Sequence, residues 1–314
     1  MNKIETAGAD FKTADAASYD AHVQTFARFS AELTTPLARR LVEMANISTN
    51  QRVLDLGTGT GVVALEAAKA ISSAGECVGV DLSEKMFAAA RAEADRRLSD
   101  APIKFVKMDA ESLQFESACF DVVLSLFAVL HFPNPETALN EMYRVLKPGG
   151  RLVVGIGSAP PWFSLVGLRH AMQLVPKTIA LLCGYRLVGP GFLERLIEEA
   201  IPAGREPEES ALARTGRNRT RALPRLVRDA GFLDLREDWE GHEATLKTPA
   251  DFWDIQRTFS SIARKRLNRA TPEQVAEVRT KFDARCQQVL ARSGKLVYPV
   301  GAFFVAAKKP EQSR

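Results

Sequence analysis

A glycine-rich turn that directly follows a short apolar segment constrains the fold of this chain more than any other feature. Residues 53–56, Val-Leu-Asp-Leu, have the composition of a buried parallel strand, and Gly57, Gly59 and Gly61 follow at once. Because glycine has no β-carbon, such a turn bends tightly and lets its backbone approach a ligand closely. The Ala-rich residues 62–71 then predict a helix. This strand–turn–helix unit indicates the start of a ligand-binding α/β domain.

Predicted strands and helices continue to alternate after this unit. Three further predicted strands end near Asp81, Asp109 and Phe127, and another covers residues 151–156. Alternation of this kind predicts a parallel sheet covered by helices on both faces. We therefore expect an α/β fold, Rossmann-like and doubly wound, with a mostly parallel seven-stranded sheet and a helical cap or insertion.

The chain divides into four predicted segments. They are an N-terminal helical segment (1–46), the α/β core (47–157), an apolar helical insertion with a polar linker (158–220), and a C-terminal part that completes the sheet (221–314). Residues before about Ala14 have the composition of a loose tail, and Pro36 is expected to break the first helical stretch. Arg169 and Lys177 interrupt the apolar segment 162–188, which therefore lacks the run of about 20 apolar residues that spans a membrane. We interpret that segment as two short amphipathic helices.

The composition excludes some classes of protein. With 46% hydrophobic and 25% charged residues, the chain is not disordered in bulk, and its net charge of +4 neither requires nor excludes an anionic partner. The four cysteines are too far apart for a zinc site, and their apolar flanks indicate reduced core thiols: Cys77, Cys119, Cys183 and Cys286. We therefore expect no metal site. The first twenty residues lack the apolar run of a secretory signal, so we expect a cytoplasmic protein.

Three acidic residues lie on or just after successive predicted strands. Asp55 is inside the first strand, where burial of a carboxylate is costly unless backbone donors or a cation meet it, and a ligand with a protonated amine would supply the cation. Asp81 ends the second strand and can accept both ribose hydroxyls of a nucleoside. Asp109 follows the third strand, where it could receive an adenine amino group. For Asp81 or Asp109 taken alone, helix capping or a solvated loop charge explains the residue about as well.

The glycine spacing favours a ligand other than NAD. In the dinucleotide fingerprint G-x-G-x-x-G the third glycine would stand at position 62, which is Val62 here, whereas this chain has its third glycine at Gly61. The turn therefore suits a ligand without a pyrophosphate.

Several stretches resemble class I S-adenosylmethionine-dependent methyltransferases. Residues 53–61 (VLDLGTGTG) resemble the first signature of that family, and residues 80–83 (VDLS) with Met86 resemble the second. Residues 130–135 (LHFPNP) and 141–150 (EMYRVLKPGG) are similar to the branch of C-methyltransferases that serves ubiquinone and menaquinone biosynthesis. One departure is that Leu130 stands where members often carry a second histidine.

The resemblance implies S-adenosyl-L-methionine as the cofactor. The loop glycines and Asp55 would hold its methionine part, Asp81 its ribose, and Asp109 with Ala110 its adenine. The expected cofactor site comprises Tyr19, Asp55, Gly57, Thr58, Gly59, Gly61, Asp81, Leu82, Met86, Asp109, Ala110 and Phe127. Tyr19 would close over the cofactor or, equally, serve as a core aromatic. His131 is the catalytic candidate, against the alternative of a structural histidine or one packed on the cofactor.

The apolar insertion predicts the kind of acceptor. Its large side chains would form a lid over the ligand edge or a helical mini-core: Trp162, Phe163, Leu165, Val166, Leu168, Leu174, Ile179, Leu181 and Leu182. Phe252 and Trp253 would line the same apolar pocket. We expect methyl transfer to an O or C atom of a small aromatic, polyketide, quinone-like or lipid acceptor.

An oxidoreductase that binds NAD is the alternative at the level of the fold, and two other functions also stay open at this point. One is a non-catalytic, regulatory S-adenosylmethionine-binding protein. The other is an RNA methyltransferase, which only the Arg-rich residues 205–228 support. Glutamates lie among these arginines and no aromatic residue is interleaved. We therefore interpret the stretch as a solvated linker and expect no nucleic-acid partner. The sequence leaves open whether the chain forms a homodimer or contacts a membrane peripherally.

Overall fold

The computed structural model describes residues 12, 17–20, 22–71, 74–98, 102–159, 177, 179–189, 191–201 and 218–311. The chain divides into two compact units. Unit 1 comprises Met1–Ala159, Glu209–Glu240 and Gly301–Arg314, and unit 2 comprises Pro160–Glu208 and Gly241–Val300.

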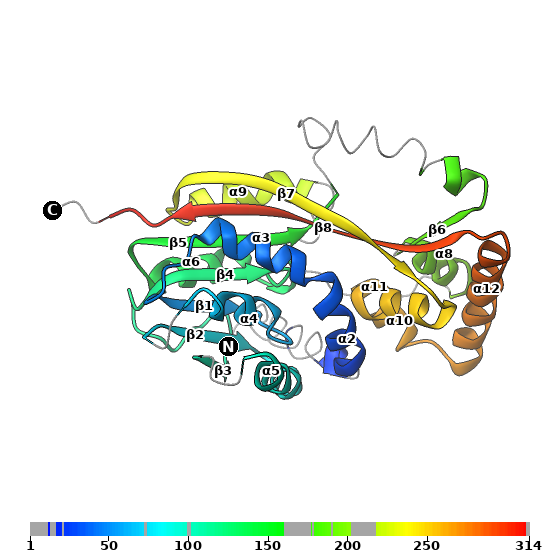
Figure 1. Ribbon diagram of the computed structural model, residues 1–314, viewed down its shortest axis with the longest axis horizontal. Coiled ribbons are helices and arrows are strands. Elements are labelled where there is room, and N and C mark those ends of the chain that lie inside the picture. Colours follow the sequence, from blue (N-terminus) through cyan, green and yellow to red (C-terminus); the bar gives the residue numbers. More distant parts are fainter. Residues whose placement is uncertain are drawn as a thin grey trace, which may run out of the picture. The chain divides into compact units, whose positions relative to one another are not determined.

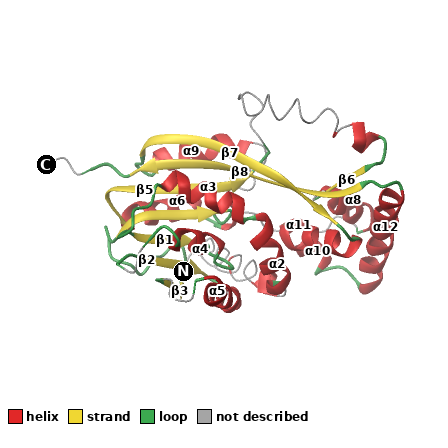
Figure 2. Ribbon diagram, in the orientation of Figure 1, coloured by secondary structure: helices red, strands yellow, loops and turns green. Residues whose placement is uncertain are grey.

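Unit 1 contains the alternating strands and helices that the sequence predicts (Figures 1 and 2). Its strands are β1 (Arg52–Leu56), β2 (Glu76–Asp81), β3 (Ile103–Lys107), β4 (Phe120–Leu126) and β5 (Leu146–Gly157). Its helices are α2 (Val23–Leu33), α3 (Thr35–Ala45), α4 (Val62–Ala68), α5 (Glu84–Arg97), η1 (Val129–His131), α6 (Pro135–Val145) and α9 (Arg219–Asp229). Unit 2 is mainly helical, with β6 (Arg186–Val188), α8 (Gly191–Ala200), α10 (Pro249–Phe259), α11 (Ser261–Leu267) and α12 (Pro272–Ala291). The long strands β7 (Leu233–Leu246) and β8 (Lys295–Lys308) contribute residues to both units.

The sheet confirms the expected Rossmann-like α/β fold. Its strand order is β3-β2-β1-β4-β5-β8-β6, with β7 paired to β8. The first four neighbouring pairs are parallel, and β8 runs antiparallel to β5. The sheet has eight strands where the sequence predicted seven, because the short strand β6 pairs with residues 295–297 of β8. The same pairing corrects the helical interpretation of the segment 162–188 at its C-terminal end.

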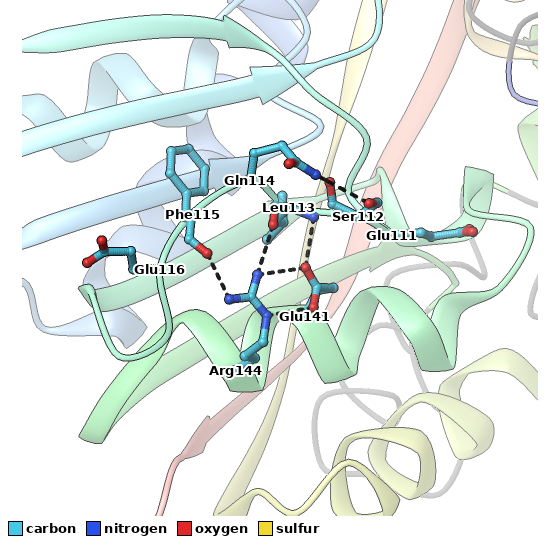
Figure 3. A pocket seen from close by; sticks show the side chains of 8 residues that line it. All are labelled: Glu111, Ser112, Leu113, Gln114, Phe115, Glu116, Glu141 and Arg144. Carbon is cyan, nitrogen blue, oxygen red and sulfur yellow. Dashed lines mark hydrogen bonds and ion pairs between the residues drawn. The ribbon is translucent and has the colours of Figure 1, made fainter.

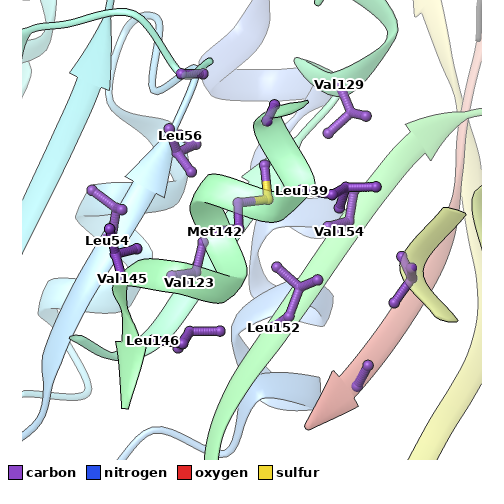
Figure 4. Close-up of a cluster of buried hydrophobic side chains, with 14 of the residues drawn as sticks. Leu54, Leu56, Val123, Val129, Leu139, Met142, Val145, Leu146, Leu152 and Val154 are labelled. Carbon is purple, nitrogen blue, oxygen red and sulfur yellow. The ribbon is translucent and has the colours of Figure 1, made fainter. Parts of the chain in front are cut away.

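Opposite faces of the sheet take alternate residues of each strand, and this decides what meets the helices. Leu54 and Leu56 of β1 belong to a buried apolar cluster that includes Leu139 and Met142 of α6 (Figure 4). Asp55, between the two leucines, lies on the other face, where its carboxylate accepts the backbone N–H of Ala64 in α4. The one polar residue inside the central strand is therefore held by the helix that the glycine turn begins.

The ends of the helices follow local sequence signals. Helix α2 ends at Leu33, and Pro36 lies in the first turn of α3, where proline leaves no hydrogen bond unmade, so the predicted break is confirmed. The hydroxyl of Ser83 accepts the N–H of Met86 and caps α5. Thr271 forms a capping box with Gln274 at the start of α12, as its sequence predicts.

The structure places two aromatic residues in a core and corrects the expectation for one cysteine. Phe252 and Trp253 are both buried, with ring centroids 5.6 Å and 5.1 Å from that of Phe282, so they pack in the interior of unit 2, and their place in an acceptor pocket stays a prediction. Cys183 is exposed instead of being a core thiol, whereas Cys77 and Cys286 are buried. None of the helices in the described part of the chain is long and apolar enough to cross a membrane.

A glycine-to-alanine pair tests how tightly the turn after β1 is packed. Gly57 has φ +70°, and a β-carbon there would lie 2.1 Å from the Cβ of Ala128. We expect Gly57→Ala to lower the free energy of unfolding by about 2–4 kcal/mol, measured by urea denaturation. Gly157→Ala is the control, since its added β-carbon would meet the Phe127 ring at an ordinary 3.9 Å. Equal stability of the two variants would contradict this account of the turn.

Candidate cofactor site

The carboxyl ends of the parallel strands bring the predicted cofactor residues to one edge of the sheet. In the register of the sheet Leu56 pairs with Val80, and Asp81 pairs with Lys107. The loops after β1, β2 and β3 are therefore neighbours, which is where open α/β sheets bind their ligands.

Main-chain conformation explains the three glycines of the first loop. Gly57, Gly59 and Gly61 have φ of +70°, +51° and +78°, a left-handed region that other residues rarely adopt. The N–H groups of Gly57 and Thr58 both donate to the carbonyl of Val80, at 2.8 Å and 3.0 Å. The loop is thus folded back onto the end of β2.

The side chain of Asp81 binds the backbone of the same loop. Its Oδ2 accepts the N–H of Gly59 at 2.9 Å, and its Oδ1 accepts the N–H of Ser83 at 3.0 Å. Burial raises the pKa of the Asp81 carboxyl above its ordinary value, although these N–H groups favour the ionised form. Leu82 and the buried Met86 follow in the same loop and helix. The structure thus brings Asp81 and the glycine turn together, and their contact with a ribose stays a prediction.

Asp55 has partners inside the protein. It is 1% exposed, and its Oδ2 accepts the Ala64 N–H at 3.1 Å. Burial raises the pKa of its carboxyl to about 7, against the opposing effect of the hydrogen bond from the Ala64 N–H. A backbone donor therefore satisfies part of the need that the sequence assigned to a ligand amine. An ammonium group beside Asp55 would favour its ionised form, so that role stays a prediction.

Asp109 is already paired with a residue that the sequence had not suggested. Its Oδ1 accepts the N–H of Glu111 at 2.9 Å, and its Oδ2 lies 2.7 Å from Nζ of Lys12. Lys12 also forms an ion pair of 2.7 Å with Glu111. The sequence placed Lys12 in a loose tail, and no local pattern signals a contact across nearly a hundred residues. Ala110, next to Asp109, is buried in the apolar cluster of unit 1.

Glu111 also connects the loop after β3 to the loop after β4. Its Oε1 accepts the N–H of Asn134 at 2.8 Å, and its Oε2 lies 3.3 Å from the side-chain amide nitrogen of Asn134. Because Asn134 ends the loop that contains His131, Glu111 links the predicted adenine and acceptor sides. The sequence analysis missed this role as well.

A shallow groove beside this loop is lined by polar groups that bind one another (Figure 3). The Arg144 guanidinium donates to the carbonyls of Leu113 at 2.9 Å and Phe115 at 2.7 Å, and it pairs with Glu141. Glu141 in turn accepts the N–H of Leu113 at 2.8 Å. We interpret these hydrogen bonds as structural contacts that fix the loop after β3 on α6.

Tyr19 and His131, predicted separately, lie next to each other. The Tyr19 hydroxyl is 3.3 Å from Nε2 of His131, and the two rings meet edge to face at 5.7 Å. His131 ends the short helix η1, which begins two residues after Phe127, a non-glycine residue with φ +65°. Such a backbone conformation outside glycine is often found at functional sites.

Most of the predicted lid lies outside the described residues. This applies to Trp162, Phe163, Leu165, Val166, Leu168 and Leu174. Ile179, Leu181 and Leu182 are described, and they are exposed to 57%, 44% and 81%, so these three do not form a buried mini-core. Among the described residues no group of three or more His, Cys, Asp or Glu side chains could hold a metal ion.

Comparison with known proteins identifies relatives of the core. Residues 54–154 match the family described as a methyltransferase domain. The demethylmenaquinone methyltransferase of Thermus thermophilus is 39% identical over 148 residues, which are 46% of this chain and 66% of that protein. The aklanonic acid methyltransferase DauC of a Streptomyces species is 35% identical over 135 residues, which are 43% of this chain and 61% of that protein. The chain thus spans just under two thirds of the length of these curated relatives.

The solved structures support the fold. The YcgJ protein of Bacillus subtilis superposes with a TM-score of 0.51 at 20% identity, over 87% of this chain and 98% of that one. At this level of identity the likeness concerns the fold alone.

The raised pKa of Asp55 predicts a pH-dependent stability. Because this carboxyl has a pKa of about 7 in the folded protein and an ordinary value of 3.8, the folded state binds the proton more tightly. Ionisation of Asp55 therefore lowers stability as the pH rises from about 4 to about 7. Asp55→Asn removes that charge and keeps an oxygen for the Ala64 N–H. We expect the variant to be more stable than the parent by about 2–4 kcal/mol near pH 8 and equal to it near pH 4, by urea unfolding. Parallel pH profiles of the two proteins would refute this.

Proposed function

We propose that this chain, which carries a class I S-adenosylmethionine-dependent methyltransferase domain over residues 54–154, transfers a methyl group to an O or C atom of a small hydrophobic acceptor. The observation that carries the proposal is the contact of the half-buried Asp81 with the glycine turn at the carboxyl edge of the sheet. The two relatives are named for demethylmenaquinone and for aklanonic acid, which are small molecules and not nucleic acids or proteins.

The residues at this edge fit S-adenosylmethionine. At Gly59 the turn presents bare backbone, and among the described residues a β-carbon there would meet only the Phe26 ring, at 3.8 Å. Asp55 offers a carboxylate to an ammonium group, and Asp81 offers one to ribose hydroxyls. Asp109 and Ala110 stand where an adenine would end. When bound, this cofactor supplies a methyl group on a sulfonium, whose sulfur is a good leaving group.

The task left to the protein is alignment and exclusion of water. Correct orientation of two reactants can lower a barrier by about 7–11 kcal/mol, so methyl transfer needs no further catalytic group when the acceptor is already a nucleophile. An acceptor that must first lose a proton would give it to the pair formed by Tyr19 and His131. Tyr19 precedes α2, and His131 lies in the loop after β4, close to Asp81. This position suits a base on the acceptor side of the site.

A transfer assay with methyl-labelled S-adenosylmethionine tests this function. We expect label in solvent-extractable products of hydroxylated aromatic, polyketide or hydroquinone acceptors, and none in bulk tRNA or in a peptide mixture. For an acceptor that loses a proton, His131→Asn should lower kcat by about 10²-fold or more. His242→Asn, a histidine of β7, is the matched control and should keep the parent's kcat. Label in RNA or peptide would contradict the proposal. So would cofactor binding without turnover across the panel, which would indicate a regulatory protein.

A further inference from the structure

Lys12 joins two carboxylates of the loop that follows β3. Its Nζ lies 2.7 Å from Oδ2 of Asp109 and 2.7 Å from Oε2 of Glu111. The side chains of Lys12 and Glu111 are largely withdrawn from solvent, at 18% and 7% exposed, and that of Asp109 is 34% exposed. Burial lowers the pKa of the ammonium, but the hydrogen bonds to both carboxylates outweigh it and raise that pKa above its ordinary value. The ammonium is therefore a charged bridge of the native state.

The charge balance leaves Asp109 able to bind a further donor. One ammonium faces two carboxylates, so the group of three keeps a net negative charge. A carboxylate oxygen can accept two hydrogen bonds, and Asp109 accepts one on Oδ1 from the Glu111 N–H and one on Oδ2 from Lys12. An amino group of a ligand could share the remaining positions. Without Lys12 the two like charges of Asp109 and Glu111 would repel each other and turn Asp109 away.

Two further residues of the N-terminal part, Asp20 and Ser30, bind the other cofactor loops as well. The Asp20 carboxylate accepts the Ser83 hydroxyl at 2.5 Å, next to Asp81. The hydroxyls of Ser30 and Thr60 lie 2.9 Å apart, at the glycine turn. The described residues Lys12, Asp20 and Ser30 therefore contact the loops after β3, β2 and β1 in turn, and Lys12 is the one that reaches the expected adenine end.

We propose that Lys12 is a positioning residue for the adenine end of the cofactor site, where it holds Asp109 toward the base. It thereby sets the preference of the site for adenine over a base without an amino group. This inference rests on the proposed function, because it requires that the site bind an adenine nucleoside.

Binding of two product analogues tests the inference. S-adenosylhomocysteine carries the adenine amino group, and S-inosylhomocysteine has a carbonyl in its place. Calorimetry on the full chain gives the ratio of their dissociation constants. We expect the parent to prefer the adenine compound, and Lys12→Met to reduce that preference by about tenfold. A role that is merely structural would weaken both compounds alike and leave the ratio unchanged.

A second variant identifies the cause as repulsion between the carboxylates. In Lys12→Met/Glu111→Gln one of the two negative charges is gone, and the glutamine oxygen can still accept the Asn134 N–H. We expect the preference for adenine to return to within about threefold of the parent. Lys104→Met is the control. Lys104 of β3 pairs with Glu76 of β2, outside the site, so this variant's ratio of the two dissociation constants should equal the parent's.

The outcomes separate this inference from the proposed function. An unchanged ratio in Lys12→Met, or tighter binding of the adenine compound by that variant, overturns the role of Lys12 and leaves the function standing. A double variant as impaired as Lys12→Met also overturns the role. A parent protein that binds neither compound overturns the proposed function and this inference with it.

Discussion

The hydrogen bond between the Asp81 carboxylate and the Gly59 N–H is the contact on which the rest of the site depends. It joins the end of β2 to the turn after β1, and the carbonyl of Val80 holds the same turn through two further N–H groups. Left-handed glycines let the backbone make these contacts without side chains in the way. A buried carboxylate is costly unless donors meet it, and here the donors come from the turn that would cradle a ligand. Fold and site thus share one interaction.

The same reasoning applies to the other acids at this edge. Asp55 is held by the start of α4, and Asp109 is held by Glu111 and Lys12. Each carboxylate has at least one partner within the protein and retains acceptor capacity for a ligand. A site built in this way is formed before its ligand arrives, which reduces the ordering that binding would otherwise require.

Sequence reasoning succeeded where a local pattern determines the outcome. The apolar strand before Gly57, the cap at Ser83 and the capping box at Thr271 depend on neighbouring residues only, and each is found in the structure. It failed where the partner is distant along the chain. The aromatic pair Phe252 and Trp253 has the composition of a pocket wall or of a core, and no local pattern indicates that both rings pack on Phe282.

Polar contacts between distant loops were equally hidden from the sequence. A lysine in a polar tail carries no sign that it will bridge Asp109 and Glu111, and Asn134 looks like a helix cap with no distant partner. Residues 186–188 lie at the end of a segment that the sequence predicts as helical. Their pairing with β8 makes them the short strand β6 instead.

The most direct test of the account is the affinity of the protein for S-adenosylhomocysteine, measured by calorimetry with and without the Asp81 carboxylate. Asp121→Ala serves as the control, because Asp121 is an acid of β4 that binds the N–H of Arg52, at the start of β1. We predict that Asp81→Ala weakens binding by about 100-fold and that Asp121→Ala leaves it close to the parent's value. If Asp81→Ala bound the nucleoside as tightly as the parent does, or if the parent did not bind it, the central claim would be wrong.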